Sequence, residues 1–282
     1  MTAPILVGEI TTRGPAADSL GTLTRAVRAA EAAGLDAVVL DDGAAPGDSA
    51  QGRFETTTLA AALAAATETI GLIVSPLPAD QAPYHVARIT ASLDHLGHGR
   101  TGWLAGAADA DGRTGELIEA VRGLWDSFDD DAFVHDRADG LYWRLAAIHR
   151  LDHQGRHFDV AGPLNVARPP QGHPVVTVTD PALAGAADLI LLEGADAARE
   201  SKQRAPHTKV LLPLPAAAGA DEAAALLADS AADGFTVRLN GADDPVLATL
   251  AALPRQGRPR HTTLRERLGL PRPASRHALT TV

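Results

Sequence analysis

The sequence predicts an α/β fold, a compact (β/α)₈ barrel, and three observations lead to it. Eight short apolar runs alternate with segments of helical periodicity. The runs are continuously apolar, as expected for parallel strands that are buried on both faces. The chain has 282 residues, which is enough for one barrel of about 250 residues. An open doubly wound sheet is the main alternative, but no glycine-rich dinucleotide loop follows the first run.

Each predicted strand is an apolar run bounded by glycine or polar residues. The eight runs are 5–10, 37–40, 71–75, 101–105, 175–179, 189–192, 210–214 and 235–239. Helical periodicity and stop signals place helices between them. The predicted helices are 20–33, 58–69, 83–96, 114–127, 195–204, 221–232 and 244–253. Only residues 181–188 separate the fifth and sixth strands, which leaves room for about two helical turns.

The alternation breaks between the fourth and fifth strands. Residues 129–174 are polar and rich in histidine and proline, without helical periodicity. We predict a non-helical excursion here, with a hairpin around residues 151–160. We expect the barrel to occupy residues 1–255 and the basic tail, 256–282, to pack on the barrel or on a partner subunit.

Composition narrows the class of protein. The formal net charge of −10 argues against nucleic acid as the main partner, because phosphate binding needs clustered Lys and Arg. The absence of cysteine excludes thiol catalysis, disulfides and cysteine-ligated metals, and it fits a reducing cytosol. No apolar run approaches the ~20 residues of a membrane helix. We therefore expect a cytoplasmic protein without a membrane partner.

Chemistry in such a barrel is expected at the carboxyl ends of the strands. Asp41 and Asp42 together could share a proton or bind a cation, although a loop Asp that caps the next segment is the favoured interpretation. His85 could donate to a ligand or act as a general acid, or it could simply contact a neighbouring loop. The candidates by strand position are Glu9, Thr11, Asp41, Asp42, Ser75, Trp103, Thr177, Thr179, Asp180, Glu193, Arg238 and Asn240.

Three histidines, His149, His153 and His157, recur at four-residue intervals. On a helix they would share a face and could bind zinc. Gly155 and the residues after it instead predict a turn and a strand, in which residues four apart are separated by about 13 Å. We therefore predict no metal site. The sequence also contains no Gly-x-Ser-x-Gly elbow and no P-loop.

Several ordered blocks of the chain resemble one protein family. The most distinctive begins Pro83-Tyr84-His85-Val86-Ala87-Arg88 and runs through Ser92-Leu93-Asp94-His95-Leu96 to Gly99-Arg100-Thr101-Gly102-Trp103. Others are Gly123-Leu124-Trp125-Asp126-Ser127, Asp152-His153-Gln154-Gly155, Gly162-Pro163-Leu164-Asn165 and Leu264-Arg265-Glu266-Arg267-Leu268-Gly269-Leu270-Pro271. Together they resemble the luciferase-like flavin-dependent monooxygenases, in particular the branch of nitrilotriacetate monooxygenase and dibenzothiophene-sulfone monooxygenase.

The resemblance implies a (β/α)₈ barrel that oxidises a small organic substrate with O₂ and reduced FMN, the flavin being supplied by a separate reductase. It also implies a homodimer. By position in the family motifs, Asp42, Ser75, Tyr84 and Trp103 would contact the flavin, and His85 would be the catalytic residue.

The chain departs from the family pattern where the flavin phosphate would bind. The family has a loop of Gly and Ser after the fifth strand, whereas this chain has Thr179-Asp180-Pro181-Ala182. A carboxylate repels phosphate, and proline lacks the backbone N–H that would bind it. The segment after the fourth strand is also short. Two hypotheses follow: a compact reduced-flavin monooxygenase, which we adopt, or a flavin-free relative that acts as a binding or assembly partner.

Overall fold

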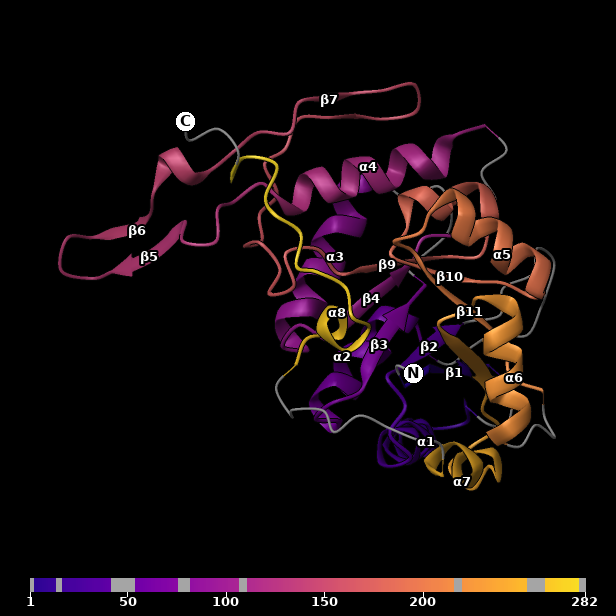
Figure 1. The fold of residues 1–282 in the computed structure, drawn as a ribbon. Coiled ribbons are helices and arrows are strands. Elements are labelled where there is room, and N and C mark those ends of the chain that lie inside the picture. The colour runs from indigo at the N-terminus through magenta and orange to yellow at the C-terminus, as the bar shows by residue number, and fades with distance from the viewer. Residues whose placement is uncertain are drawn as a thin grey trace.

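A computed structural model describes residues 3–13, 17–41, 54–75, 82–106, 111–215, 220–252 and 262–278. Its centre is a closed barrel of eight parallel strands (Figure 1), which confirms the predicted fold. The strands are β1 (Ile5–Thr11), β2 (Ala37–Asp41), β3 (Gly71–Val74), β4 (Thr101–Leu104), β9 (Val175–Val178), β10 (Leu189–Leu191), β11 (Lys209–Pro213) and β12 (Gly234–Arg238). They follow one another around the barrel in chain order, and β12 closes it by pairing with β1.

Helices connect the strands and cover the outside of the barrel. They are α1 (Leu20–Ala32), α2 (Thr56–Ala66), α3 (Pro83–Leu96), α4 (Arg113–Trp125), α5 (Ala195–Arg204), α6 (Ala220–Ser230) and α7 (Val246–Ala251), with a short 3₁₀ helix, η3 (Pro181–Ala186), between β9 and β10. The bounds of α3 and α5 match the prediction.

Helix α2 is shifted toward the N-terminus relative to the prediction. The Glu55 carboxylate accepts hydrogen bonds from the N–H groups of Thr57 and Thr58, so the helix begins two residues early. It ends at Ala66 because Thr67 turns extended, and the Arg100 guanidinium binds the carbonyl oxygens of Ala64 and Thr67. Arg100 thereby supplies donors to carbonyl groups at a helix end that would otherwise lack partners.

The alternation of side chains along each strand creates two apolar layers. The inner layer fills the barrel and includes Val7, Val39, Ile73 and Val175. The outer layer lies between strands and helices, where two clusters contain the neighbouring strand residues, such as Val38 and Val176. This division decides which strand-end side chains point into the barrel.

The excursion contains two hairpins. Strands β7 (His153–Gln154) and β8 (Asp159–Val160) form the predicted hairpin. Strands β5 (Phe133–Asp136) and β6 (Leu141–Trp143) form a second one, which the sequence did not indicate, followed by the 3₁₀ helix η2 (Leu145–Ala147). Figure 1 shows the β5–β6 hairpin projecting away from the barrel.

The last described segment, residues 262–278, packs against the amino-terminal end of the barrel. Its short helix α8 (Leu264–Arg267) lies there, and Leu264, Leu268 and Leu270 join the inner apolar cluster. The Leu264 N–H donates to the Gly99 carbonyl oxygen at 2.8 Å. A Cβ on Gly71 would lie 2.6 Å from the Leu264 side chain, so only glycine leaves space for α8 at this strand.

Among the helices of the described ranges, none combines the length and the apolar character that crossing a bilayer requires.

Candidate functional site

Polar side chains gather at the carboxyl-terminal mouth of the barrel. Glu9, Asp41 and Ser75 lie two residues after Val7, Val39 and Ile73 of the inner layer, so strand alternation directs them to the same side. Glu9 pairs in register with Arg238 across β1 and β12. Asp41 and Arg238 are exposed, and Glu9 and Ser75 are half-buried. The mouth thus offers carboxylates, a hydroxyl and a guanidinium to a ligand.

Thr177 is a polar residue inside the barrel. It follows Val175 of the inner layer and is fully buried. Its Oγ1 has no hydrogen-bond partner. A buried hydroxyl without a partner is costly, by roughly 1–3 kcal/mol. Such an atom fits a site that a polar group of a ligand completes.

Tyr84 and His85 lie at the first turn of α3. Pro83 occupies the first helical position, and the N-cap residue Ala82 provides no side-chain cap. Tyr84 packs against the outer apolar cluster, whereas His85 is exposed. Their rings meet edge to face at 6.3 Å. His85 is therefore accessible to a ligand, and its catalytic role stays a prediction.

Trp103 does not point into the barrel. It belongs to the outer cluster, is 1% exposed and contacts Trp125 edge to face at 6.3 Å. Its neighbour Leu104 packs against the inner cluster instead. Trp103 is accordingly a core residue, and its predicted contact with flavin has no support from this orientation.

The two other predicted flavin contacts are Ser75 and Asp42. The Ser75 carbonyl accepts a hydrogen bond from Thr56 Oγ1 at 2.6 Å, which fixes the start of α2 to the end of β3. Asp42 lies outside the described residues. The structure therefore places Ser75 at the mouth of the barrel.

The N-terminus of η3 does not fit a phosphate. This end of the helix follows the fifth barrel strand, where the family motif would place the flavin phosphate. Asp180 is the N-cap residue, and its carboxylate already accepts the Ala182 N–H at 2.9 Å. Pro181 has no N–H to offer. The chain's own carboxylate thus takes the position that an anion would need.

The three spaced histidines bind three separate partners. His149 Nε2 lies 3.0 Å from Asp129, and His157 Nε2 lies 3.2 Å from the Asp111 carbonyl oxygen. His153 Nε2 lies 3.2 Å from Glu116, which also accepts the backbone N–H groups of residues 156–158. Glu116 thereby holds the β7–β8 hairpin onto α4. These histidines stabilise the excursion.

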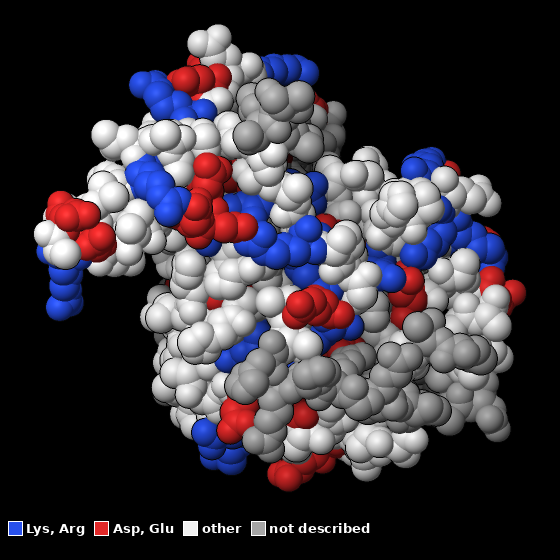
Figure 2. All heavy atoms as spheres, turned by 60° about the vertical axis from the view of Figure 1, so that its left-hand side comes forward, with Lys and Arg blue, Asp and Glu red and all other residues white. Residues whose placement is uncertain are grey.

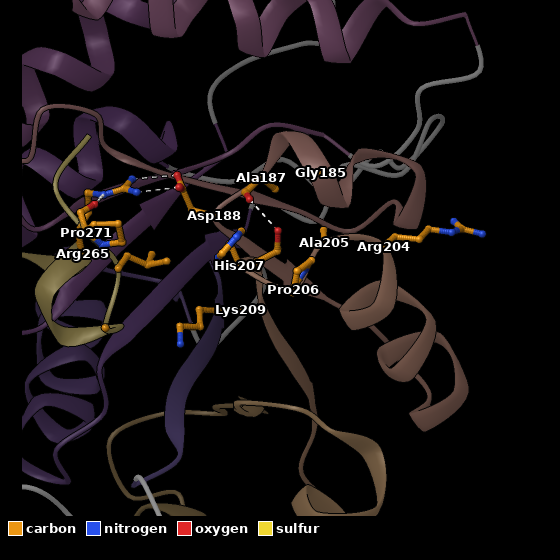
Figure 3. A pocket seen from close by; sticks show the side chains of 13 residues that line it. Gly185, Ala187, Asp188, Arg204, Ala205, Pro206, His207, Lys209, Arg265 and Pro271 are labelled. Atoms are coloured by element: carbon orange, nitrogen blue, oxygen red, sulfur yellow. Dashed lines mark hydrogen bonds and ion pairs between the residues drawn. The ribbon is translucent and has the colours of Figure 1, made fainter. Parts of the chain in front are cut away.

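A cavity of about 520 Å³ lies at the opposite end of the barrel (Figure 3). It is beside α8 and the starts of β10 and β11, and its charged lining residues are Asp188, Arg204, His207, Lys209 and Arg265. Burial alone would raise the pKa of Asp188, but Arg265 and Arg122 hold that pKa below its usual value. Arg265 binds Asp188 at 2.8 and 3.0 Å, and Arg204 points away from this pair in Figure 3. The amino-terminal end of a barrel serves stability, so we do not place the chemistry here.

Comparison with known proteins identifies relatives along the whole chain. The model of the family described as "Luciferase-like monooxygenase" matches residues 3–266. The pristinamycin IIA synthase subunit designated B, from Streptomyces pristinaespiralis, is 75% identical over 284 residues, covering 100% of both chains. We refer to this relative as synthase component B.

Other relatives match over less of their length. Nitrilotriacetate monooxygenase component A of Aminobacter aminovorans is 45% identical over 141 residues, covering 44% of this chain and 31% of its own. The other pristinamycin IIA synthase subunit of S. pristinaespiralis, here synthase component A, is 38% identical over 141 residues, covering 44% of this chain and 29% of its own. The crystal structure of long-chain alkane monooxygenase has the same fold, with a TM-score of 0.82, 16% identity and coverage of 95% and 96%.

Proposed function

Because the chain belongs to the luciferase-like monooxygenase family, whose members are flavin-dependent monooxygenases, we propose that it is one subunit of a two-subunit enzyme. This enzyme would use reduced FMN and O₂ to oxidise a small organic substrate. The observation that carries the proposal is the 75% identity with synthase component B across the full length of both chains. Oxidation in the formation of pristinamycin IIA, or of a close chemical relative, is the substrate class that we infer.

The second subunit in this proposal is a longer member of the same family. Synthase component A is itself similar to this chain, although the match covers 29% of its length. A homologous protein of greater length can carry segments that this chain lacks. A separate flavin reductase would supply the reduced FMN.

The flavin, when bound, supplies the activation of O₂. Glu9 and Arg238 at the mouth, together with the exposed His85, are the side chains of this chain that would orient a polar substrate and hold a proton near it. The N-terminus of η3 is closed to the phosphate by Asp180, so we assign the phosphate to another part of the enzyme.

Reconstitution tests this proposal directly. The chain is mixed with synthase component A of S. pristinaespiralis, a flavin reductase, NADH, FMN and the precursor of pristinamycin IIA in air. We expect product by mass spectrometry only when both proteins of the pair are present. Failure of this chain in a mixture where synthase component B gives product would overturn the proposed reaction.

A titration tests the flavin separately. Photoreduced FMN is added anaerobically to the chain alone and to its mixture with synthase component A, with tryptophan fluorescence as the signal. Micromolar binding by the mixture is expected. No binding by the mixture at millimolar flavin would contradict the proposed cofactor.

A further inference from the structure

The projecting hairpin β5–β6 is a preformed element. We call residues 129–148 the arm. Phe133 pairs with Trp143 and Asp136 with Leu141. At its base, the Asp129 N–H donates to the Ala147 carbonyl oxygen at 3.0 Å, and a small cluster of Phe128, Ala132 and Ala147 is buried. The arm is therefore anchored at its base.

Large apolar side chains of the arm are exposed. The exposed fractions are 44% for Leu141, 54% for Tyr142, 41% for Trp143 and 77% for Leu145. Elsewhere in the described ranges, only Leu20 and Leu96 are large, apolar and exposed. A two-stranded hairpin alone is at best marginally stable in water. Covering this surface would therefore stabilise the arm as well as the complex.

The exposed rings are held in place by one another. Tyr142 contacts His135 edge to face at 4.8 Å and Trp143 at 5.2 Å. Phe133 contacts Tyr142 at 5.8 Å and Trp143 at 6.1 Å. Because these rings already restrict each other, little side-chain entropy is lost when a partner covers them. Tyr and Trp are also the residue types that dominate the energy of protein interfaces.

The exposed area indicates the centre of an interface. An aromatic side chain buries about 150–250 Å², so the four exposed side chains present roughly 400 Å² of apolar surface. A stable interface buries about 800 Å² per partner. The arm alone is thus about half of an interface, and the surface at its base would have to supply the remainder.

Charge favours a partner other than a second copy. The tip of the arm carries Asp136 and Asp139 against one basic residue, Arg137. The whole chain has a net charge of −10, so two copies would repel each other. At the base, Asp130 is neutralised by Arg272 and Arg168. Figure 2 shows such acidic and basic side chains lying next to each other on one face of the molecule.

We propose that the arm docks into an apolar groove, flanked by basic side chains, on the longer luciferase-like subunit. This inference rests on the proposed two-subunit function. It adds the surface through which the two proteins recognise each other, with Tyr142 and Trp143 as the anchors.

Calorimetric binding to synthase component A of S. pristinaespiralis tests the arm. The variant carries Tyr142→Ser and Trp143→Ser, and Leu20→Ser, an equally exposed position at the start of α1, is the control. We expect the arm variant to bind at least thirty-fold more weakly, the loss that about 2 kcal/mol at a hot spot produces, and the control to bind as the wild type does. Circular dichroism checks that both variants are folded.

A measurement on the unmutated chain supplements the variant. The chain has three tryptophans, and Trp103 and Trp125 are both 1% exposed. With 5-fluorotryptophan in this chain alone, only the ¹⁹F signal of Trp143 should shift strongly when synthase component A is added.

The outcomes separate the two proposals. The role of the arm is overturned if wild type and arm variant bind synthase component A with equal affinity, or if the Trp143 signal does not change in the complex. In either case the pairing of the two proteins stands. If wild type does not bind synthase component A, the pairing itself fails. If the wild type associates with itself and the arm variant does not, the arm binds a second copy of this chain, and the proposed partner is wrong.

Discussion

The two ends of the barrel differ in how their polar groups are used. At the amino-terminal end, buried ionisable groups bind one another: Arg265 holds Asp188, and Asp126 accepts from Arg168 and lies 3.0 Å from His173. Two buried atoms at this end, Nε of Arg122 and Nε of Arg267, have no hydrogen-bond partner. At the carboxyl-terminal end, the described polar side chains Asp41 and Arg238 are exposed, and Thr177 Oγ1 is buried without a partner.

This difference assigns stability to the amino-terminal end of the barrel and ligand binding to the carboxyl-terminal end. A network of paired buried groups fixes one structure and leaves few groups free for a substrate. The exposed Arg238 side chain contributes little stability, and it and the Thr177 hydroxyl can bind a ligand. We therefore expect substitutions at the amino-terminal end to change the free energy of unfolding, and substitutions at the mouth to change ligand binding.

The largest expected effect is on stability, at Arg265. Its guanidinium contacts Asp188 and the carbonyl oxygens of Pro271 and His173. Arg265→Ala leaves the Asp188 carboxylate buried with only part of its partners. We expect a loss of about 3 kcal/mol in the free energy of unfolding, measured by urea denaturation.

The matched control for Arg265→Ala is Arg199→Ala, which removes an exposed ion pair with Asp196 and Asp229. Exposed pairs contribute little, so this variant should unfold at the same urea concentration as the wild type. Equal effects of the two substitutions would mean that the amino-terminal network is not where stability is concentrated.

The next effect is on flavin affinity, at η3. Asp180→Ser with Pro181→Gly removes the negative charge beside the Ala182 N–H and adds one N–H. Asp180 closes this position to phosphate in the wild type, so opening it should let this chain alone bind FMN about ten-fold more tightly, since a helix terminus and one removed charge are worth about 1 kcal/mol or slightly more. Tryptophan fluorescence titration measures the change.

A second Asp-Pro pair, in which the carboxylate also accepts the N–H two residues on, occurs after β12 and provides the control. Asp244 accepts the Val246 N–H at 3.0 Å, and Pro245 lies between them. Asp244→Ser with Pro245→Gly should leave FMN affinity unchanged. An equal gain in both variants, or in neither, would show that the phosphate position after β9 is wrong.

A smaller effect depends on pH, at Asp94. Burial raises the pKa of this carboxyl to about 6, although hydrogen bonds from Gln171 and Thr101 oppose the rise. The folded protein then binds this proton more tightly than the unfolded chain, whose carboxyl has an ordinary pKa of 3.8. The stability contributed by protonated Asp94 is therefore lost as the pH rises through 6.

The variant Asp94→Asn isolates this contribution, because its side chain does not titrate. Between pH 5 and pH 7 the wild type should lose about 1 kcal/mol of stability relative to the variant. Urea denaturation at pH 5, 6 and 7 gives the difference directly and cancels the titration of His173, whose pKa burial lowers. A difference that stays constant over this range would show that Asp94 titrates outside it.

The fold could be predicted from the sequence because its signals are local. Eight apolar runs and residues such as Pro83 mark the barrel elements within a few neighbours. The β5–β6 hairpin was missed because none of its strand residues is buried, so no alternation between a buried and an exposed face marks the two strands. The early start of α2 was missed because its cap is Glu55, which is not among the preferred cap residues.

The site was harder to predict, for two physical reasons. A strand that is buried on both faces has no apolar–polar alternation, so the sequence did not reveal that Trp103 points outward and Thr177 inward. Arg265 and Asp188 are separated by 77 positions, and no local pattern indicates such a pair. Asp180 was identifiable from sequence because the cap and the proline beside it act locally.

The smallest effect contrasts two buried threonines at opposite ends of the barrel. Thr177 Oγ1 has no partner, whereas Thr208 Oγ1 donates to the carbonyl oxygens of Ala184 and Ala187 at 2.7 and 3.1 Å. Valine matches threonine in shape but lacks the hydroxyl. Thr208→Val should therefore cost about 1 kcal/mol, and Thr177→Val should be neutral or stabilising by up to about 1 kcal/mol. Thermal unfolding measures both changes in stability. If Thr177→Val also weakens flavin or substrate binding by the two-protein mixture, the Thr177 hydroxyl contacts the ligand. If Thr177→Val destabilises the protein as much as Thr208→Val does, the two ends of the barrel do not differ.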